Sequence, residues 1–376
     1  MTDGEGKFAL RDLDPTLFFQ LLVLAPDHAP LITELDVDPL KKLAPLELVP
    51  RDLDNEPPER VVRGVVRDAA GKPVARARIE PVAQKLARGV RYGAVEADPL
   101  AVSAADGTFE FAVYQPGMVV QAELQASGFA KCASGWLTAG AEDNVVVLHT
   151  GVTLTGRVER DGQPVAGYAL GLTLEEQGAG TNLGTTSMAS DATGRFTFVN
   201  VPPEAAHLLY GELSNSGRGA LALRKVTTGA DDSTLDLGVL TLERGAQLSG
   251  RVVVTDASVL PEGAALLLSR DAVSDTVVVA LTADGSFRAD SLPGDILTLG
   301  VRLRTHHVSK ANASYDFVNH QGLIGSVRED LELELLIDPG PEPREDPKFD
   351  KELWQRYEEL CSSPLRGRTA EASAPR

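Results

Sequence analysis

The chain is poor in the residues on which several protein classes depend. Its 376 residues include two cysteines and two tryptophans, and aromatic residues make up 5%. Cys132 and Cys361 lie far apart and fall in no metal-binding or redox spacing, so neither site is indicated. A disulfide between Cys132 and Cys361 is one alternative, and two cysteines do not indicate a cellular compartment.

Long apolar runs are also missing. No stretch of about 18 apolar residues occurs, so the sequence predicts no membrane-spanning segment. The opening MTDGEGKFALRD has no basic region followed by an apolar one, so no signal peptide is visible in it.

Positive charge is the third scarcity. Lys and Arg number 36 against 54 Asp and Glu, which gives a formal net charge of -18. Such a field repels nucleic acids and anionic membranes, so we expect no nucleic-acid partner. We read the acidity as an aid to solubility. Apolar residues make up 43% of the chain, enough to bury cores in two to four domains.

One phrase recurs along the chain. An acidic turn with a Gly precedes a Phe, and a Pro follows six or seven residues later. The four phenylalanines are spaced by 101, 87 and 91 residues, and they are Phe8, Phe109, Phe196 and Phe287. A period near 90 fits one small domain per copy and is too long for a solenoid repeat.

A second phrase precedes the first in three copies. It reads VVRGVVRDAAGKPVARARI from Val61, LTGRVERDGQPVAGYALGL from Leu154 and LSGRVVVTDASVLPEGAALLL from Leu248. Its anchoring glycines are Gly64, Gly156 and Gly250. Short runs rich in Val, Thr, Leu and Phe, cut by Gly, Pro and Asp about every ten residues, predict an all-β sandwich. The Pro after each Phe strand cannot donate a ladder hydrogen bond, so it should end the strand.

The segments TGRVERDGQPVAGYAL and DATGRFTFVNVPP resemble the carboxypeptidase regulatory-like domain, a transthyretin-like β-sandwich. The resemblance is strongest over 152–243 and good over 61–150. Over 248–338 it weakens, because SVLPEGA replaces the compact Gly-x-Pro-Val turn. The matching residues serve turns and core, so they imply a fold and no carboxypeptidase activity.

The predicted organisation is tandem Ig-like or transthyretin-like modules with a short C-terminal helix. We expect a truncated half-module at 1–50, because only seven residues precede Phe8 and the opening strands have no room. Three sandwiches follow, named here the first module (58–150), the second module (151–244) and the divergent third module (245–338). The rest, 339–376, should be an acidic Pro-rich linker, a helix after Asp346 and a disordered tail.

Catalytic signatures are not found. The six histidines form no His-x-x-Glu or His-Glu-x-x-His pattern, and the adjacent His306 and His307 should face opposite sides of a strand. Gly-x-Ser-x-Gly, P-loop and dinucleotide-binding motifs do not occur. We therefore expect a non-enzymatic protein without cofactor or metal.

Two ligand classes remain open. Acidic turns with Asp52, Asp54 and Glu56, or with Asp231 and Asp232, resemble calcium ligands but supply few oxygens. Trp136 and, second, Tyr92 are the candidates for stacking on a sugar, although a strand-end packing role is the simpler interpretation.

The sequence thus predicts an exported spacer or protein-binding protein at an extracellular, periplasmic or cell-surface location. Its partner would be a protein or a glycan, and the sequence sets no oligomeric state. The alternative is a carbohydrate-binding, or calcium-assisted, accessory module of a secreted system.

Overall fold

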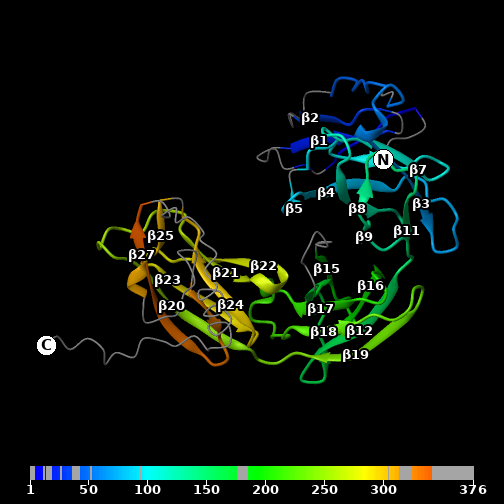
Figure 1. Ribbon diagram of the computed structural model, residues 1–376. Helices are drawn as coiled ribbons and strands as arrows, with labels where there is room; N and C mark the ends of the chain where they lie inside the picture. The colour runs from blue at the N-terminus through cyan, green and yellow to red at the C-terminus, as the bar shows by residue number, and fades with distance from the viewer. Residues whose placement is uncertain are drawn as a thin grey trace. The chain divides into compact units, whose positions relative to one another are not determined.

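The computed structural model describes residues 5–11, 13, 19–25, 28–35, 43–50, 53–93, 95–175, 185–303, 305–312 and 323–340. These residues form an all-β protein of many short sheets, with 3-10 turns between strands (Figure 1). Two compact units can be separated, one with most of residues 1–151 and one with most of the rest. Among the described residues, no helix has the length and apolar character needed to cross a membrane.

The residues of the first module begin with η1 (Pro58–Arg60) and continue as β3 (Val61–Asp68), β4 (Arg78–Leu86), β5 (Gly89–Tyr92), β6 (Ala101–Val102), β7 (Thr108–Ala112), β8 (Val119–Gln125), β9 (Cys132–Ala133), β10 (Leu137–Thr138) and β11 (Asn144–Leu148). One sheet has the order β11-β3-β7 and the other β10-β8-β4-β5. Buried side chains of both sheets, among them Phe111 and Leu124, share one apolar cluster. The two sheets therefore form a sandwich.

The second module repeats this plan with β12 (Val152–Arg160), β13 (Gln163–Pro164), β14 (Ala169–Leu174), β15 (Thr186–Ala189), β16 (Arg195–Val201), β17 (Ala206–Gly211), η2 (Leu213–Asn215), β18 (Arg224–Thr227) and β19 (Thr234–Thr241). One sheet has β12 between β16 and β19, with β13 at the end of β12. The other has the order β15-β14-β17-β18.

The third module contains β20 (Ala246–Val254), β21 (Ala265–Arg270), η3 (Asp271–Val273), β22 (Asp275–Ala280), β23 (Ser286–Leu292), β24 (Ile296–Val301), β25 (His306–Val308), η4 (Lys310–Asn312), β26 (Leu323–Ser326) and β27 (Leu331–Pro339). Its sheets have the orders β23-β20-β27-β25 and β22-β21-β24-β26. Leucines of both sheets again meet in one cluster.

The same connection order recurs in all three modules. The first strand lies centrally and pairs in parallel with the last strand of its module, as β3 with β11, β12 with β19 and β20 with β27. On its other side lies the Phe strand, β7, β16 or β23. Parallel neighbours need long crossovers, and here the crossover contains the Phe strand and the second sheet. The all-β tandem fold expected from the sequence is confirmed.

The two recurring phrases meet across this central pair. Gly64 lies opposite Phe109 and Gly250 opposite Phe287 in the strand register. At Gly156, a Cβ atom would lie 2.5 Å from the Cζ of Phe196. The glycine is therefore required because the neighbouring ring covers its backbone.

The acidic turns bond to the chain's own backbone. Gly107, Gly194 and Gly285 all have a positive φ, and each carbonyl accepts a hydrogen bond from the first strand of its module. Side-chain and backbone hydrogen bonds from Thr108 lower the pKa of Asp106. Hydrogen bonds from Thr282 and Ser286 lower the pKa of Asp284 to about 2.

Residues 5–50 lack the recurring arrangement in their described part. Their strands are β1 (Phe19–Val23) and β2 (Leu31–Leu35), which form an antiparallel pair. Phe8 is 39% exposed and lies outside any strand, unlike the three later phenylalanines. The truncated half-module stays a prediction. The helix expected after Asp346, the tail and Cys361 lie outside the described residues.

Candidate functional site

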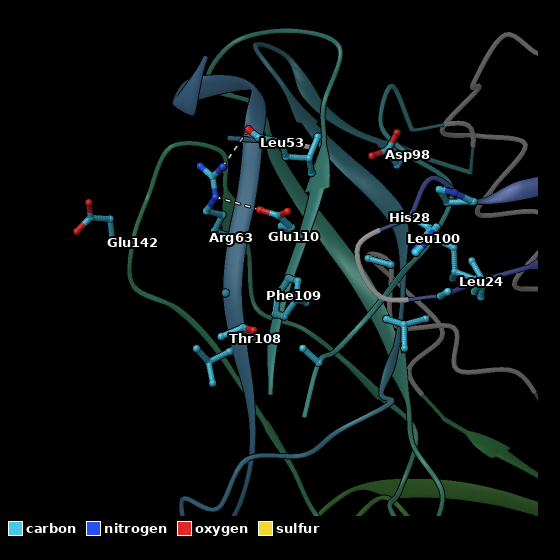
Figure 2. A pocket seen from close by; sticks show the side chains of 17 residues that line it. Leu24, His28, Leu53, Arg63, Asp98, Leu100, Thr108, Phe109, Glu110 and Glu142 are labelled. Carbon is cyan, nitrogen blue, oxygen red and sulfur yellow. Dashed lines mark hydrogen bonds and ion pairs between the residues drawn. The ribbon is translucent and has the colours of Figure 1, made fainter. Parts of the chain in front are cut away.

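A pocket of about 380 Å³ lies at one edge of the first module's sandwich (Figure 2). Arg63 and Glu110 line one side, with Arg63 Nε 3.1 Å from Glu110 Oε2. Leu24, His28 and Leu100 line the other side. The recurring phrases contribute Gly64 and Phe109 to its walls but did not predict the pocket, because the walls come from six separate stretches of chain.

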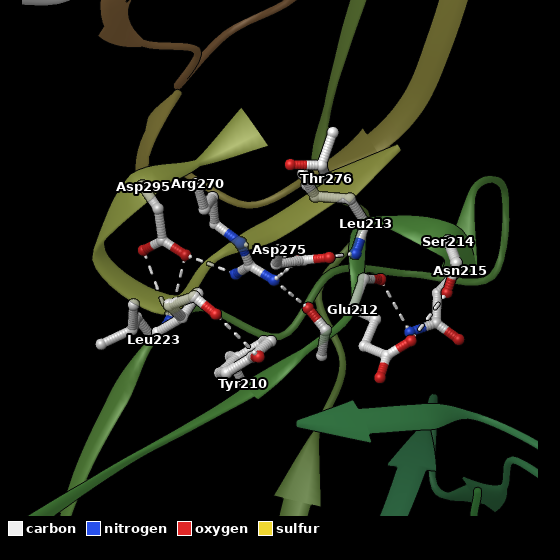
Figure 3. A network of polar contacts seen from close by, with 12 residues as sticks. Tyr210, Glu212, Leu213, Ser214, Asn215, Leu223, Arg270, Asp275, Thr276 and Asp295 are labelled. Carbon is white, nitrogen blue, oxygen red and sulfur yellow. Dashed lines mark hydrogen bonds and ion pairs between the residues drawn. The ribbon is translucent and has the colours of Figure 1, made fainter. Parts of the chain in front are cut away.

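The junction between the second and third modules contains a buried arginine. Arg270, the last residue of β21, has a side chain that is 1% exposed. Its Nη2 donates to Asp275 Oδ2 at 2.6 Å and its Nη1 to Asp295 Oδ2 at 2.9 Å. Both carboxylates belong to the third module (Figure 3). The guanidinium thus forms two ion pairs away from water, where the low dielectric strengthens the attraction between the charges.

This cluster is tied to the second module by four further contacts. Arg270 Nη2 also donates to the Gly211 carbonyl, and its Cζ lies 4.8 Å from the ring centroid of Tyr210. Asp275 accepts a hydrogen bond from the Leu213 N–H at 3.0 Å. Asp295 accepts one from the Leu223 N–H at 3.2 Å. Every member of the network therefore touches both modules or a residue that does.

Apolar packing continues the junction. Leu213, from η2 of the second module, belongs to the buried cluster of the third module. Tyr210 donates its hydroxyl hydrogen to the Val273 carbonyl at 3.3 Å, and burial raises its pKa. Gly219 N–H donates to Ser291 Oγ at 3.1 Å. These contacts join the two modules through directional hydrogen bonds as well as apolar packing.

The residues predicted to stack on a sugar lie on one sheet but at opposite edges. Trp136 directly precedes β10 and Tyr92 ends β5, in the order β10-β8-β4-β5. Three strand spacings, about 14 Å, separate such positions. Trp136 is 38% and Tyr92 47% exposed, and Lys85 Nζ lies 6.0 Å from the Trp136 ring centroid. They do not form one platform.

The other candidates are placed as follows. Burial raises the pKa of the half-buried Cys132 to about 11, with Glu123 adding to the shift, so the thiol stays protonated near neutrality. Asp54 lies 3.5 Å from Arg63, and Asp52 is outside the described residues. No group of three or more His, Cys, Asp or Glu in the described ranges is arranged to hold a metal ion.

Sequence reasoning missed the arginine junction. Arg270 stands in LLLSRDAVSD, an ordinary strand end, and its partners lie 5, 25 and 59 residues away along the chain. The only local signal is Asp275, placed so that β21 and β22 pair Arg270 with it across the strands.

Comparison with known proteins gives distant matches only. No family model matches the chain, and no curated protein does. Among solved structures, a Streptococcal ancillary pilin is 10% identical with a TM-score of 0.22, covering 76% of this chain and 100% of that one. The major pilin subunit of Bacillus cereus is 10% identical with a TM-score of 0.20, covering 75% and 99%. The Bacillus anthracis TIE protein is 10% identical with a TM-score of 0.22, covering 74% of this chain.

The chain spans half the length of the Bacillus anthracis protein. These scores are below those of a shared domain arrangement, so no function is transferred from any of the three.

Proposed function

We propose that this protein is a non-catalytic structural protein whose tandem transthyretin-like modules act as a stiff, exported spacer. The observation that carries the proposal is the Arg270 junction, which joins the second and third modules through a buried guanidinium. Modules that only carry independent sites are usually joined by mobile linkers and small polar interfaces.

A buried ion cluster is a costly way to join two modules. Removing three charges from water costs several kcal/mol per ion unless each is fully paired. Such clusters are retained in some proteins because they permit only one geometry. Here the two carboxylates, the Gly211 carbonyl and the Tyr210 ring satisfy the arginine from several sides. Fixed geometry is what a spacer needs.

The remaining parts of the proposal rest on the repeats. The acidic and glycine-containing motifs form turns and core contacts, which supports a structural role for the repeats. We base three further parts of the proposal on the sequence resemblance. They are the transthyretin-like assignment, an extracellular, periplasmic or surface location, and a protein partner.

Single-molecule extension of the full chain tests the mechanical role. We expect the second and third modules to unfold in one step that releases about 190 residues of contour length, near 3.4 Å per residue. In Arg270→Met, two separate steps should replace it. Two steps already in the unaltered chain would contradict the proposal.

Glycan binding at Trp136 is the second candidate function. The Trp136 indole favours it, because the side chain is 38% exposed and Lys85 Nζ lies 6.0 Å from its ring centroid. A glycan array probed with the full chain should show binders that Trp136→Ala loses and Tyr114→Ala, an exposed control, retains. An array without signal above background removes this candidate.

A further inference from the structure

The pocket of the first module lies beside an unpaired stretch of one strand edge. Strand β7 is an outer strand of its sheet, because the order is β11-β3-β7. Edge strands present backbone donors and acceptors that proteins normally cover. The ladder hydrogen bonds show which residues of β7 face that edge.

The odd-numbered residues that flank β7, Gly107 and Val113, bond toward β3 and the residue before it. Val66 N–H donates to the Gly107 carbonyl and Val113 N–H to the Arg60 carbonyl, both at 2.8 Å. In an antiparallel ladder, hydrogen-bonded and non-bonded pairs alternate. The backbone groups of Thr108, Glu110 and Ala112 therefore point away from β3, toward the edge.

Two of these three residues are covered. Ala112 N–H donates to Asp98 Oδ2 at 2.6 Å, and its carbonyl accepts from Asp98 N–H at 2.9 Å. The Thr108 carbonyl accepts from Ala104 N–H at 2.7 Å, and Thr108 N–H donates to Asp106. Between these clamps, no described residue bonds the backbone of Glu110 on the edge side.

The gap has a structural cause. The chain runs beside β7 at Ala97, which forms a bridge with Val113. It then leaves β7 and joins the other sheet as β6, where Ala101 pairs with Ile79 of β4. The chain returns to β7 at Ala104. The vacated space is lined by Leu100, Ala101 and Ala104 and by Glu110 itself, and it is the pocket of Figure 2.

The size and charge of the gap define what fits. Thr108 and Ala112 are about 13 Å apart along an extended strand, which leaves room for two or three residues. Three carboxylates line the pocket, those of Asp98, Glu110 and Glu142, against the guanidinium of Arg63 and the imidazole of His28. Arg63 already lies 3.1 Å from Glu110 and 3.5 Å from Asp54. The balance favours a positively charged ligand.

We propose that this pocket binds the amino-terminal end of a short extended peptide. One peptide residue would pair with the Glu110 N–H and carbonyl as a one-residue strand addition, and the free α-ammonium group would lie among the carboxylates. Apolar walls at Leu24, Leu53 and Leu100 would hold a small aliphatic side chain. A longer strand cannot pair with this edge, because the backbone groups of Thr108 and Ala112 are already hydrogen-bonded.

A proline at position 110 isolates the backbone contact. Glu110→Pro removes the edge-facing N–H but no bond to β3, and Pro is tolerated on edge strands. Glu110→Ala is the matched control, because it loses the same carboxylate and keeps the N–H. The probes are Ala-Leu-Ala amide and its N-acetylated form, titrated into the isotope-labelled full chain and followed by amide NMR shifts.

We expect the free-amine probe to bind the unaltered protein saturably, with a Kd of about 1 mM or tighter, and to shift the Glu110 amide. Glu110→Pro should weaken binding about tenfold relative to Glu110→Ala, and acetylation should weaken it at least fivefold. The absence of saturable shifts up to about 10 mM overturns the proposal. Equal loss in both variants overturns the strand addition, and equal binding of both probes overturns the ammonium site.

If Glu110→Pro does not fold, as judged by its amide spectrum, the Glu110 amide in the unaltered chain decides. A probe that binds without moving that amide contradicts the proposal. These outcomes are independent of the stiffness of the junction at Arg270.

Discussion

At the scale of single residues, the recurring phrases act through contacts that the sequence alone does not reveal. The spacing of Gly156 and Phe196 predicts a repeat, but not that the ring lies on the glycine. That contact depends on the register of β12 against β16, which is set by the whole module. Turn glycines such as Gly194 were predictable, because a positive φ has a local signature.

A methyl group at Gly156 tests this contact. Gly156→Ala would place Cβ 2.5 Å from Phe196 Cζ, so the ring or the strand must move. We expect the free energy of unfolding to fall by about 1–3 kcal/mol in chemical denaturation. Gly135→Ala is the control, since its Cβ would meet nothing within 4 Å. Phe196→Leu should partly relieve the loss, and strictly additive effects of the two changes would argue against the contact.

At the scale of elements, a buried serine in the first and in the second module bonds to two backbone groups. Ser190 Oγ donates to the Val165 carbonyl at 2.6 Å and accepts from Tyr168 N–H at 2.9 Å. Ser103 makes the same pair of bonds with Val74 and Ala77 in the first module. Both serines stand six residues before the repeat Phe, where the third module has Leu281. The third module therefore lacks both this serine, with its two backbone hydrogen bonds, and the compact Pro-Val turn.

Removing the Ser190 hydroxyl should lower the free energy of unfolding. Ser190→Ala leaves the Val165 carbonyl and the Tyr168 N–H without their side-chain partner in a buried place, so we expect about 1–3 kcal/mol of destabilisation. The exposed Ser214→Ala should change stability by no more than about 0.5 kcal/mol in the same thermal melts. A harmless Ser190→Ala would show that the hydroxyl only fills space.

The turn of the third module predicts a pH dependence. Hydrogen bonds hold the pKa of Asp284 at about 2, below its usual 3.8. A depressed carboxyl pKa stabilises the fold above its unfolded value, so this contribution is full above about pH 4 and disappears as pH falls toward 2. Asp284→Asn should therefore flatten the acid side of the melting-temperature profile, whereas Asp161→Asn, 94% exposed, should not. Parallel profiles for Asp284→Asn and the unaltered chain would contradict this role.

At the scale of the whole molecule, the fold class and the repeats followed from the sequence, whereas the junction and the pocket did not. Strand periodicity and turn residues are local features, so the fold class and the repeats could be predicted from the sequence. Arg270, Tyr210 and Asp295 come together only when two finished modules pack, and the Glu110 gap exists only because β6 leaves one sheet for the other. The stacking candidates Trp136 and Tyr92 were chosen by residue type, which carries no information on which strands become neighbours.

The central claim is that the second and third modules form one stiff body through Arg270. Spin labels are attached at two exposed positions, Gln163→Cys and Val259→Cys, in a chain with Cys132 and Cys361 replaced by alanine. Pulsed electron paramagnetic resonance then measures the distance between the two modules. We predict one narrow distance distribution, unchanged by Arg288→Met, whose arginine is 63% exposed, and clearly broadened by Arg270→Met. A distribution that is already broad with Arg270 in place, or is equally narrow without it, would contradict the account.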